Sequence, residues 1–244
     1  MNHGDRDATE PSVTHVSEPG AFAGEQLEIV GPAYQHLFRS RRLAVGAGLR
    51  IVDGLGRARR GTVTHIERKR AEVELGPDLP SHEPERRVHL FVGALRPERA
   101  DWLVEKTTEL GVTSITFLAT ERTPRRYGDG RLERQQRVAV SAVEQCRRSR
   151  VPEIRGVVPW DDILSKPLAT STFVLDGGGE NAFTAAARLP SGAVAHLFIG
   201  PEGGFTDDEI HQLKASGASA WSLGGTVLRV ETAAVVATGA VLGS

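Results

Sequence analysis

The chain has 244 residues, of which 39% are hydrophobic and 25% are charged, so it can form one large domain or two smaller ones with a buried core. Its single cysteine, Cys146, excludes an internal disulfide framework and is typical of a reducing compartment. The polar first 20 residues lack a signal-peptide pattern, and no apolar run approaches the roughly 20 residues of a membrane span. We therefore expect a soluble, cytoplasmic protein.

The formal net charge of −1 conceals two strongly basic segments. Residues 36–70 contain ten Arg or Lys and two acidic residues, and residues 121–155 contain ten Arg and five acidic residues. The guanidinium fork of Arg pairs well with phosphate. The clustering indicates a polyanionic partner such as RNA, although a solvated basic face would give the same pattern.

The first 80 residues predict a tail and a small β-barrel. Residues 1–20 are rich in Asp, Glu, Ser, Thr, Pro and Gly, which predicts a disordered tail. Short strand-like runs follow, and residues 71–75 alternate apolar and charged side chains. The predicted strands are 27–30, 49–52, 60–66 and 71–75, with a short basic helix at 33–43. We expect a β-barrel over residues 21–80, and a Pro-rich linker at 76–87 marks its boundary.

From residue 88 onward, strands alternate with helices, which predicts a parallel α/β sheet in a domain over residues 88–244. Pro97 and Gly111 frame a helix over 97–110, and Thr206 with Glu209 forms a capping box that starts another. The predicted strands are 88–95, 113–119, 172–176, 195–199 and 219–223, and the other helices are 131–149, 206–217 and 231–242.

Three successive strands end in glycine-rich loops, at residues 177–179, 200–204 and 224–225. Because ligands bind beyond the carboxyl ends of parallel strands, we expect these loops to converge on one pocket. One such loop would more often be an ordinary tight turn, but three in succession favour a site. The motifs of P-loop NTPases and Rossmann dinucleotide sites are absent, and the histidines lack zinc-ligand spacing, so no metal site is predicted.

Five stretches of the sequence carry a resemblance to a known family. They are Lys106-Thr-Thr-Glu-Leu-Gly-Val112, Glu121-Arg-Thr123, Glu144-Gln-Cys-Arg-Arg-Ser-Arg-Val-Pro-Glu-Ile154, Ile199-Gly-Pro-Glu-Gly-Gly-Phe205 and Leu223-Gly-Gly-Thr-Val-Leu-Arg-Val-Glu-Thr-Ala233. In these residues and their order the chain resembles the RsmE-type 16S ribosomal RNA uridine-N3 methyltransferases of the SPOUT superfamily. The resemblance covers about residues 22–242. It departs from the family at Arg96-Pro-Glu-Arg99, where the family usually carries a Lys near position 96.

The resemblance implies an architecture and a reaction. Residues 21–80 would be a PUA-like RNA-binding barrel, and the α/β domain at 88–244 would be a SPOUT-type parallel sheet with a C-terminal trefoil knot, a rare exception among unknotted chains. S-adenosylmethionine would bind in the knot of a homodimer. The product would be N3-methyluridine in the 16S rRNA of the small ribosomal subunit, and no membrane or DNA partner is implied.

The three loops then become the expected cofactor cradle. The expected cofactor-binding residues are Leu175, Ile199, Gly200, Pro201, Gly203, Gly204, Leu223, Gly224, Val227, Leu228 and Thr232. Apolar members can line an adenine slot, and the glycines allow close approach of the backbone. The expected RNA contacts are Arg39, Arg41, Arg42, Arg122, Arg147 and Arg148. Arg147 and Arg148 also close a predicted helix, where positive charge is favourable without RNA.

The chemistry suggests three catalytic candidates. Uridine N3 is mostly protonated at neutral pH, so attack on the methyl group requires loss of that proton or stabilisation of negative charge on O2 and O4. Arg229 could stabilise that charge, and Glu231 or Glu202 could accept the proton. Alternatively, Glu231 is simply favourable at a helix start, and Glu202 braces its loop.

Two other functions stay open from the sequence. The chain could have another SPOUT specificity, such as 2′-O-ribose methylation, because the cofactor cradle does not define the accepting atom. It could also be a non-catalytic RNA-binding factor in ribosome assembly, which the basic segment at residues 36–70 would serve equally well.

Overall fold

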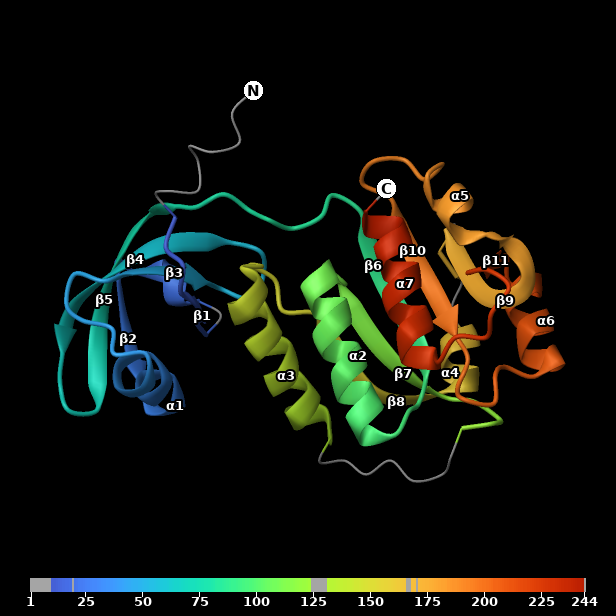
Figure 1. Cartoon of the computed structure of the whole chain (residues 1–244), viewed down its shortest axis with the longest axis horizontal. Helices are drawn as coiled ribbons and strands as arrows, with labels where there is room; N and C mark the ends of the chain where they lie inside the picture. The colour runs from blue at the N-terminus through green and yellow to red at the C-terminus, as the bar shows by residue number, and fades with distance from the viewer. Residues whose placement is uncertain (1–9, 19, 124–130, 166–167, 170, 244) are drawn as a thin grey trace. The chain divides into compact units, whose positions relative to one another are not determined.

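A computed structural model of the whole chain describes residues 10–18, 20–123, 131–165, 168–169 and 171–243 (Figure 1). The chain forms two compact units. The first comprises the residues up to Glu83 together with Val143–Val151, and the second comprises Pro84–Ala142 together with Pro152 onward. Within the described ranges, no helix has both the length and the apolar character needed to span a bilayer.

The first unit is built on a five-stranded sheet with the order β1-β3-β4-β5-β2. Its strands are β1 (Thr14–Val16), β2 (Gln26–Val30), β3 (Gly48–Val52), β4 (Ala58–Ile66) and β5 (Arg70–Asp78). Neighbouring strands are antiparallel except for β1, which runs parallel to β3. Between β1 and β3 lie a 3₁₀ turn, η2 (Ala21–Ala23), the helix α1 (Gly31–Tyr34) and a π-helical turn, η3 (Gln35–Ser40).

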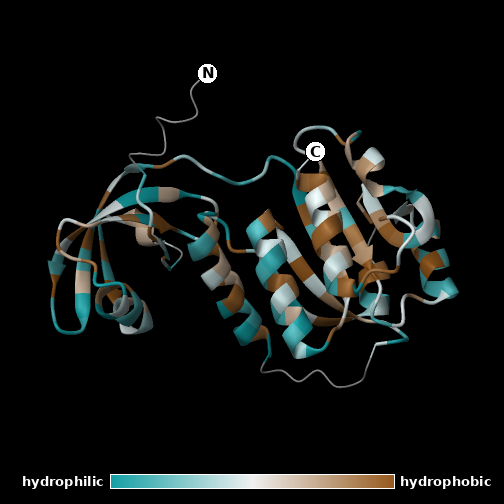
Figure 2. Cartoon of the chain, viewed as in Figure 1, coloured by the Kyte–Doolittle hydropathy of each residue, from teal (hydrophilic) through white to brown (hydrophobic). Residues whose placement is uncertain are grey.

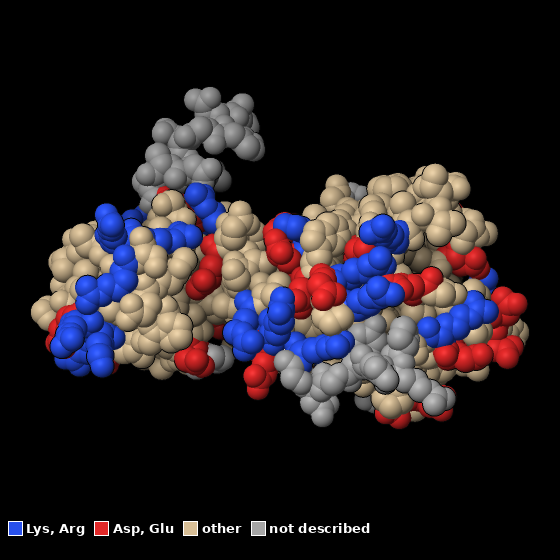
Figure 3. Space-filling view, turned by 60° about the horizontal axis from the view of Figure 1, so that its bottom comes forward, with Lys and Arg blue, Asp and Glu red and all other residues tan. Residues whose placement is uncertain are grey.

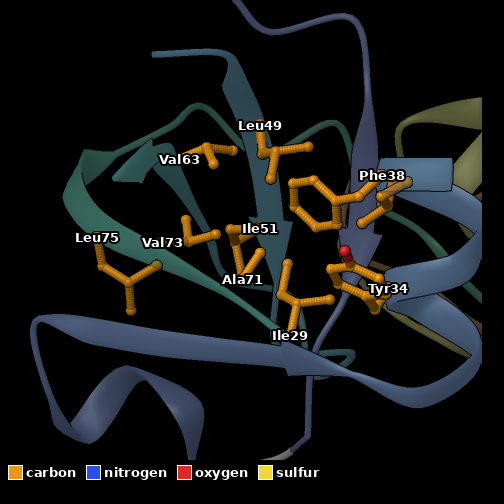
Figure 4. Packing of buried hydrophobic residues seen from close by; sticks show 10 residues of the cluster. Ile29, Tyr34, Phe38, Leu49, Ile51, Val63, Ala71, Val73 and Leu75 are labelled. Carbon is orange, nitrogen blue, oxygen red and sulfur yellow. The ribbon is translucent and has the colours of Figure 1, made fainter. Parts of the chain in front are cut away.

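The core of this unit follows from the alternation of its strands. Ala71, Val73 and Leu75 of β5 are buried, while the charged residues between them lie on the other face. Figure 4 shows these side chains facing residues of β2 and β3, with the rings of Tyr34 and Phe38 beside them. The two rings stack with their centroids 5.3 Å apart. The predicted helix at 33–43 thus supplies the aromatic residues that complete the core.

The structure corrects the prediction of a disordered tail over residues 1–20 in one part. Thr14–Val16 forms β1, and its main chain pairs with Arg50–Val52 of β3. Residues 1–9 lie outside the described residues. The strand was missed because so short a segment has little apolar pattern of its own, and its order comes from pairing with β3.

A buried arginine ties distant segments of the first unit together. Arg50 is fully buried, and its guanidinium donates to the carboxylate of Glu10, to the carbonyl of Pro80 at 2.9 Å and to the hydroxyl of Ser149 at 2.9 Å. Burial lowers the pKa of Arg50, with the carboxylate of Glu10 acting in the opposite direction. Residues 143–151 therefore complete this unit, although the sequence places them inside the predicted 88–244 domain.

The second unit is a six-stranded sheet in which all neighbouring strands are parallel, with the order β11-β9-β10-β6-β7-β8. This confirms the predicted α/β class. The strands are β6 (Arg87–Gly93), β7 (Ser114–Ala119), β8 (Glu153–Pro159), β9 (Thr172–Asn181), β10 (Val194–Ile199) and β11 (Ser219–Ser222). The helices that follow them are α2 (Pro97–Leu110), α3 (Arg131–Cys146), α4 (Trp160–Leu164), α5 (Ala182–Ala186), α6 (Asp207–Ala215) and α7 (Val230–Leu242).

Helices cover both faces of this sheet. On one face α7 packs against α2, α5, β6 and β10. On the other face, apolar side chains of α4 and α6 pack against Leu118, Val174 and Phe198 of the sheet. Figure 2 shows α7 as a largely hydrophobic helix, in contrast to the mixed surface of α2. Both faces of the sheet are therefore buried, as the continuous apolar runs of its central strands predict.

The ends of the helices were the most predictable local features. α2 begins at Pro97 and is capped at its C-terminus by Gly111, which adopts a left-handed φ of 112° and donates its N–H to the carbonyls of Thr107 and Thr108. β8, α4 and α5 were missed. β8 lies at the edge of the sheet and buries only Ile154, so its sequence lacks a strong apolar signal.

The predicted capping box at α6 is present and joins two segments. The Thr206 N–H donates to Glu209 at 2.8 Å, and the Glu209 N–H donates to the Thr206 hydroxyl at 3.2 Å. The other carboxylate oxygen of Glu209 accepts the N–H of Glu121 at 2.9 Å. Glu209 is buried, so its carboxylate connects the start of α6 to the loop after β7.

Replacing Glu209 with Ala should therefore destabilise the protein by about 2 kcal/mol, because two amide donors lose their acceptor. Asp207→Ala is the matched control, since Asp207 is exposed in the same helical turn. It should change the free energy of unfolding by about 0.5 kcal/mol or less. Urea unfolding measures both variants, and equal effects would contradict a specific role for Glu209.

Candidate active site

A cavity of about 660 Å³ lies at the carboxyl ends of β9, β10 and β11 in the second unit. All three predicted glycine-rich loops contribute to its wall, as expected for a parallel sheet. The lining residues that carry side chains of interest are Arg99, Leu175, Asp176, Ile199, Glu202, Leu223, Val227, Leu228 and Arg229. The loops meet because each continues a strand of the same sheet.

The first loop is a bulge within β9. Val174 pairs with Ala220 of β11, and the next pair joins Glu180 to Trp221, so residues 175–179 leave the ladder. A Cβ atom at Gly179 would lie 2.4 Å from the carbonyl carbon of Ala220. The glycine therefore lets the two strands close behind the bulge, and the bulge places Leu175 and Asp176 on the cavity wall.

The second loop follows β10 and packs tightly against the end of β6. A Cβ atom at Gly93 would lie 2.3 Å from the nitrogen of Pro201, a distance that no side chain can occupy. Arg122 holds the other side of this loop, because its Nη1 donates to the carbonyl of Gly203 at 2.9 Å and to that of Phe205 at 3.4 Å. The loop is thus fixed from both sides.

The third loop joins β11 to α7 and is open. Gly224 has a left-handed φ of 123°, and the side chain of Val227 is fully exposed. Arg229 is the N-cap residue of α7. Its exposed side chain lines the cavity and makes no hydrogen bond or ion pair with the described part of the chain. The loop therefore presents a cation beside an apolar surface.

A second arginine of the cavity wall, Arg99, lies close to two acidic residues. Arg99, in the first turn of α2, donates from Nη1 to the Glu202 carboxylate at 2.8 Å, and its Nε lies 3.7 Å from the Glu231 carboxylate. Glu202 lines the cavity and is exposed, whereas Glu231 is buried and does not line it. The sequence interpretation missed Arg99 as a site residue. The sequence could have indicated Arg99, because Arg96-Pro-Glu-Arg99 stands at the start of a helix that follows the carboxyl end of β6.

A second acid on the cavity wall was also missed. Asp176 accepts a hydrogen bond from Lys214 of α6 at 3.0 Å. This contact, with help from the Gly178 N–H, lowers the pKa of Asp176 against the opposing effect of burial. Asp176 therefore stays ionised at neutral pH. Asp176 is the last residue of the predicted strand 172–176 and directly precedes the glycine-rich loop at 177–179, which was the available signal.

The structure brings most of the predicted cofactor residues to the cavity, with two exceptions. Gly203 faces Arg122, because an added Cβ would lie 3.4 Å from side-chain atoms of that residue. Thr232 lies in the first turn of α7 outside the cavity wall. Cofactor contact by these two residues stays a prediction. Of the three catalytic candidates, Arg229 and Glu202 line the cavity and Glu231 does not.

The predicted RNA-contacting arginines divide into two groups. Arg39, Arg41 and Arg42 are exposed in the first unit, and Figure 3 shows basic side chains gathered at the edge of that unit. Arg148 has the wrong environment for RNA contact, because it is 4% exposed and its Nη2 pairs with Glu83 at 2.6 Å. Arg122 contacts the loop after β10, and Arg147 is half-buried.

Two families of known proteins match the chain. An RNA methyltransferase domain matches residues 82–242, and an RNA methyltransferase PUA domain matches residues 31–76. The fold and the loop cavity thus define an RNA methyltransferase domain preceded by a PUA domain.

Particular relatives narrow this class. The ribosomal RNA small subunit methyltransferase E of Mycobacterium bovis is 33% identical over 217 residues, which cover 84% of this chain and 82% of the relative. The Synechocystis protein of the same name is 30% identical over 208 residues, with 83% and 68% covered. The crystal structure of the Neisseria gonorrhoeae protein of that name, bound to S-adenosyl methionine, has a TM-score of 0.82 and 28% identity over 95% of this chain and 96% of that chain. The chain belongs to the ribosomal RNA small subunit methyltransferase E family, which confirms the predicted family.

Arg122→Ala should loosen the second loop, because two carbonyls lose a charged donor. We expect amide hydrogen exchange at residues 203–205 to accelerate about tenfold. Arg155→Ala is the matched control, since Arg155 is exposed and pairs with Glu153 of its own strand. Unchanged exchange in the Arg122 variant would contradict the bracing role and leave RNA contact as the better explanation.

Proposed function

We propose that the chain transfers a methyl group from S-adenosylmethionine to N3 of a uridine in the 16S rRNA of the small ribosomal subunit. The observation that carries this proposal is the cavity formed by three loops at the carboxyl edge of the sheet. The S-adenosyl methionine-bound relative has the same fold over 95% of this chain. The cytoplasm, where ribosomes are assembled, is the proposed location.

The cavity has the chemical character that this cofactor requires. Leu175, Ile199 and Leu228 provide apolar surface for an adenine ring. Added Cβ atoms at Gly204 and Gly224 would meet nothing, so these glycines border open space and leave backbone groups accessible. The wall carries the carboxylates of Asp176 and Glu202, which can attract a sulfonium cation, together with the cations Arg99 and Arg229.

The side chains at the cavity supply the remaining chemistry. The cofactor brings an activated methyl group when bound, so the chain mainly supplies position, proton transfer and charge stabilisation. Glu202 faces the cavity and is the proposed acceptor of the uridine N3 proton. Arg229 faces it without a described partner and would stabilise negative charge on O2 and O4 of the base. We do not assign the role of proton acceptor to Glu231, because it is buried and does not line the cavity.

The knot and the homodimer belong to the same proposal. The knot is proposed because the chain belongs to the ribosomal RNA small subunit methyltransferase E family, for which the sequence resemblance implies it. The fully exposed Val227 at the cavity supports a second copy that covers this loop. The PUA domain, with exposed Arg39, Arg41 and Arg42, would hold the RNA through phosphate contacts.

Calorimetry and mapping of the modified atom test the reaction. We expect the purified protein to bind S-adenosylmethionine and to add one methyl group to 16S rRNA at a position that stops reverse transcriptase, because N3 lies on the pairing edge. Mass spectrometry of the isolated nucleoside identifies the atom. A modified nucleoside with an intact pairing edge and a methylated ribose would reject N3 in favour of 2′-O transfer. RNA binding without cofactor binding would reject the enzyme.

Arg229→Ala should separate cofactor binding from catalysis. We expect kcat to fall about 100-fold, because a charge-stabilising group is lost, while the Kd for the cofactor changes by less than about threefold. Arg188→Ala is the matched control, because Arg188 is exposed and pairs with Glu180 away from the cavity wall. An Arg229 variant with the wild-type kcat would remove this residue from the mechanism.

A further inference from the structure

Arg99 is the only side chain on the described cavity wall that contacts two carboxylates from different segments. Glu202 belongs to the loop after β10, and Glu231 belongs to the first turn of α7. The contacts use different nitrogens, because Nη1 reaches Glu202 at 2.8 Å and Nε reaches Glu231 at 3.7 Å. A guanidinium fork can serve both acids at once, whereas an ammonium group cannot fix them in the same way.

The two acids are not equivalent. The side chain of Glu202 is 37% exposed and lines the cavity, whereas that of Glu231 is 10% exposed and lies off its wall. The Oε2 atom of Glu231 is buried and receives no hydrogen bond from a described residue. The negative charge of Glu231 is favoured at the N-terminus of α7. Glu231 therefore pairs with the guanidinium of Arg99 off the cavity wall, whereas Glu202 pairs with it on the wall.

The contact with Arg99 affects the position of the Glu202 carboxylate, which is the proposed proton acceptor. Glu202 lies between Gly200 and Gly204, in a loop whose backbone is fixed by Gly93 and Arg122, while its own side chain is 37% exposed. Arg99 restrains this carboxylate by donating to its Oε1 atom, and no described residue donates to its Oε2 atom. A proton acceptor must lie within hydrogen-bond reach of its proton, and a displacement of about 1 Å can lower a rate about 100-fold.

We propose that Arg99 is a positioning residue, which holds the Glu202 carboxylate toward the substrate and is itself anchored by Glu231. This inference rests on the proposed function, since it specifies how the proposed proton acceptor is oriented. It assigns no contact between Arg99 and the base, so its effect should pass entirely through Glu202.

Single-turnover methylation of 16S rRNA by the full-length protein tests this order. Arg99→Gln should lower the rate of methyl transfer about 10- to 100-fold, with the cofactor Kd changed by less than about threefold. In a Glu202→Gln background, Arg99→Gln should cause no further loss. Glu231→Gln should slow the protein that retains Arg99 and should have no effect once Arg99 is Gln. Arg99→Lys should recover only part of the rate, because one ammonium cannot hold both carboxylates.

Arg96→Gln is the matched control. Arg96 precedes the same helix, is exposed, and its side chain has no hydrogen bond or ion pair with the described residues. Its single-turnover rate should equal that of the wild type.

Other outcomes would overturn the inference. A wild-type rate of methyl transfer in Arg99→Gln would reject the inference. If the rate of the double variant falls by the product of the two single-variant losses, Arg99 acts independently of Glu202 and the inference is also rejected. Loss of cofactor binding would make Arg99 a structural residue of the cavity. If Arg99→Gln fails to fold, Arg99→Lys and Glu231→Gln decide the question by their rates. A wild-type protein that methylates no RNA would reject the proposed function itself, which separates the two failures.

Discussion

The candidate site depends on the absence of a side chain at Gly93. The backbone of the loop after β10 comes so near to the end of β6 that a Cβ atom there would lie 2.3 Å from Pro201. Close packing of this kind leaves the loop one position, since the protein interior has low compressibility. From that fixed loop, Glu202 reaches the cavity on one side, and Gly203 meets Arg122 on the other.

The parallel sheet explains why the charged groups converge although they are distant in sequence. Arg99 follows β6, Glu202 follows β10, and Arg229 and Glu231 follow β11. All of these strands end at the same edge. The apolar surface of the cavity comes from the strands and loops. Of its charged side chains, Arg99 and Arg229 come from helix starts, whereas Glu202 comes from the loop after β10 and Asp176 from the bulge in β9.

The sequence was most informative where local chemistry determines structure. Pro97, Gly111 and the pair Thr206 and Glu209 marked helix ends correctly, because capping depends on a few adjacent residues. The glycine loops located the cavity for a similar reason. Tertiary contacts were beyond reach: nothing local distinguishes the buried Arg148, paired with Glu83, from an exposed arginine.

The same limit applied to the catalytic candidates. Glu202 and Glu231 looked equivalent in the sequence, and only the folded chain separates them into one residue on the wall and one behind it. Arg99 went unnoticed because its two partners lie more than 100 positions away along the chain. Sequence motifs identify the segments that form a site, but tertiary packing determines which of their side chains contact one another.

The discontinuity of the first unit constrains how the protein is made. Residues 143–151 leave the ribosome after β6 and β7 of the second unit and before β8. Until that moment, Arg50 lacks Ser149 as a partner. The PUA-containing unit therefore finishes folding during synthesis of the methyltransferase domain, and a fragment that stops at Glu83 would lack part of its own interior.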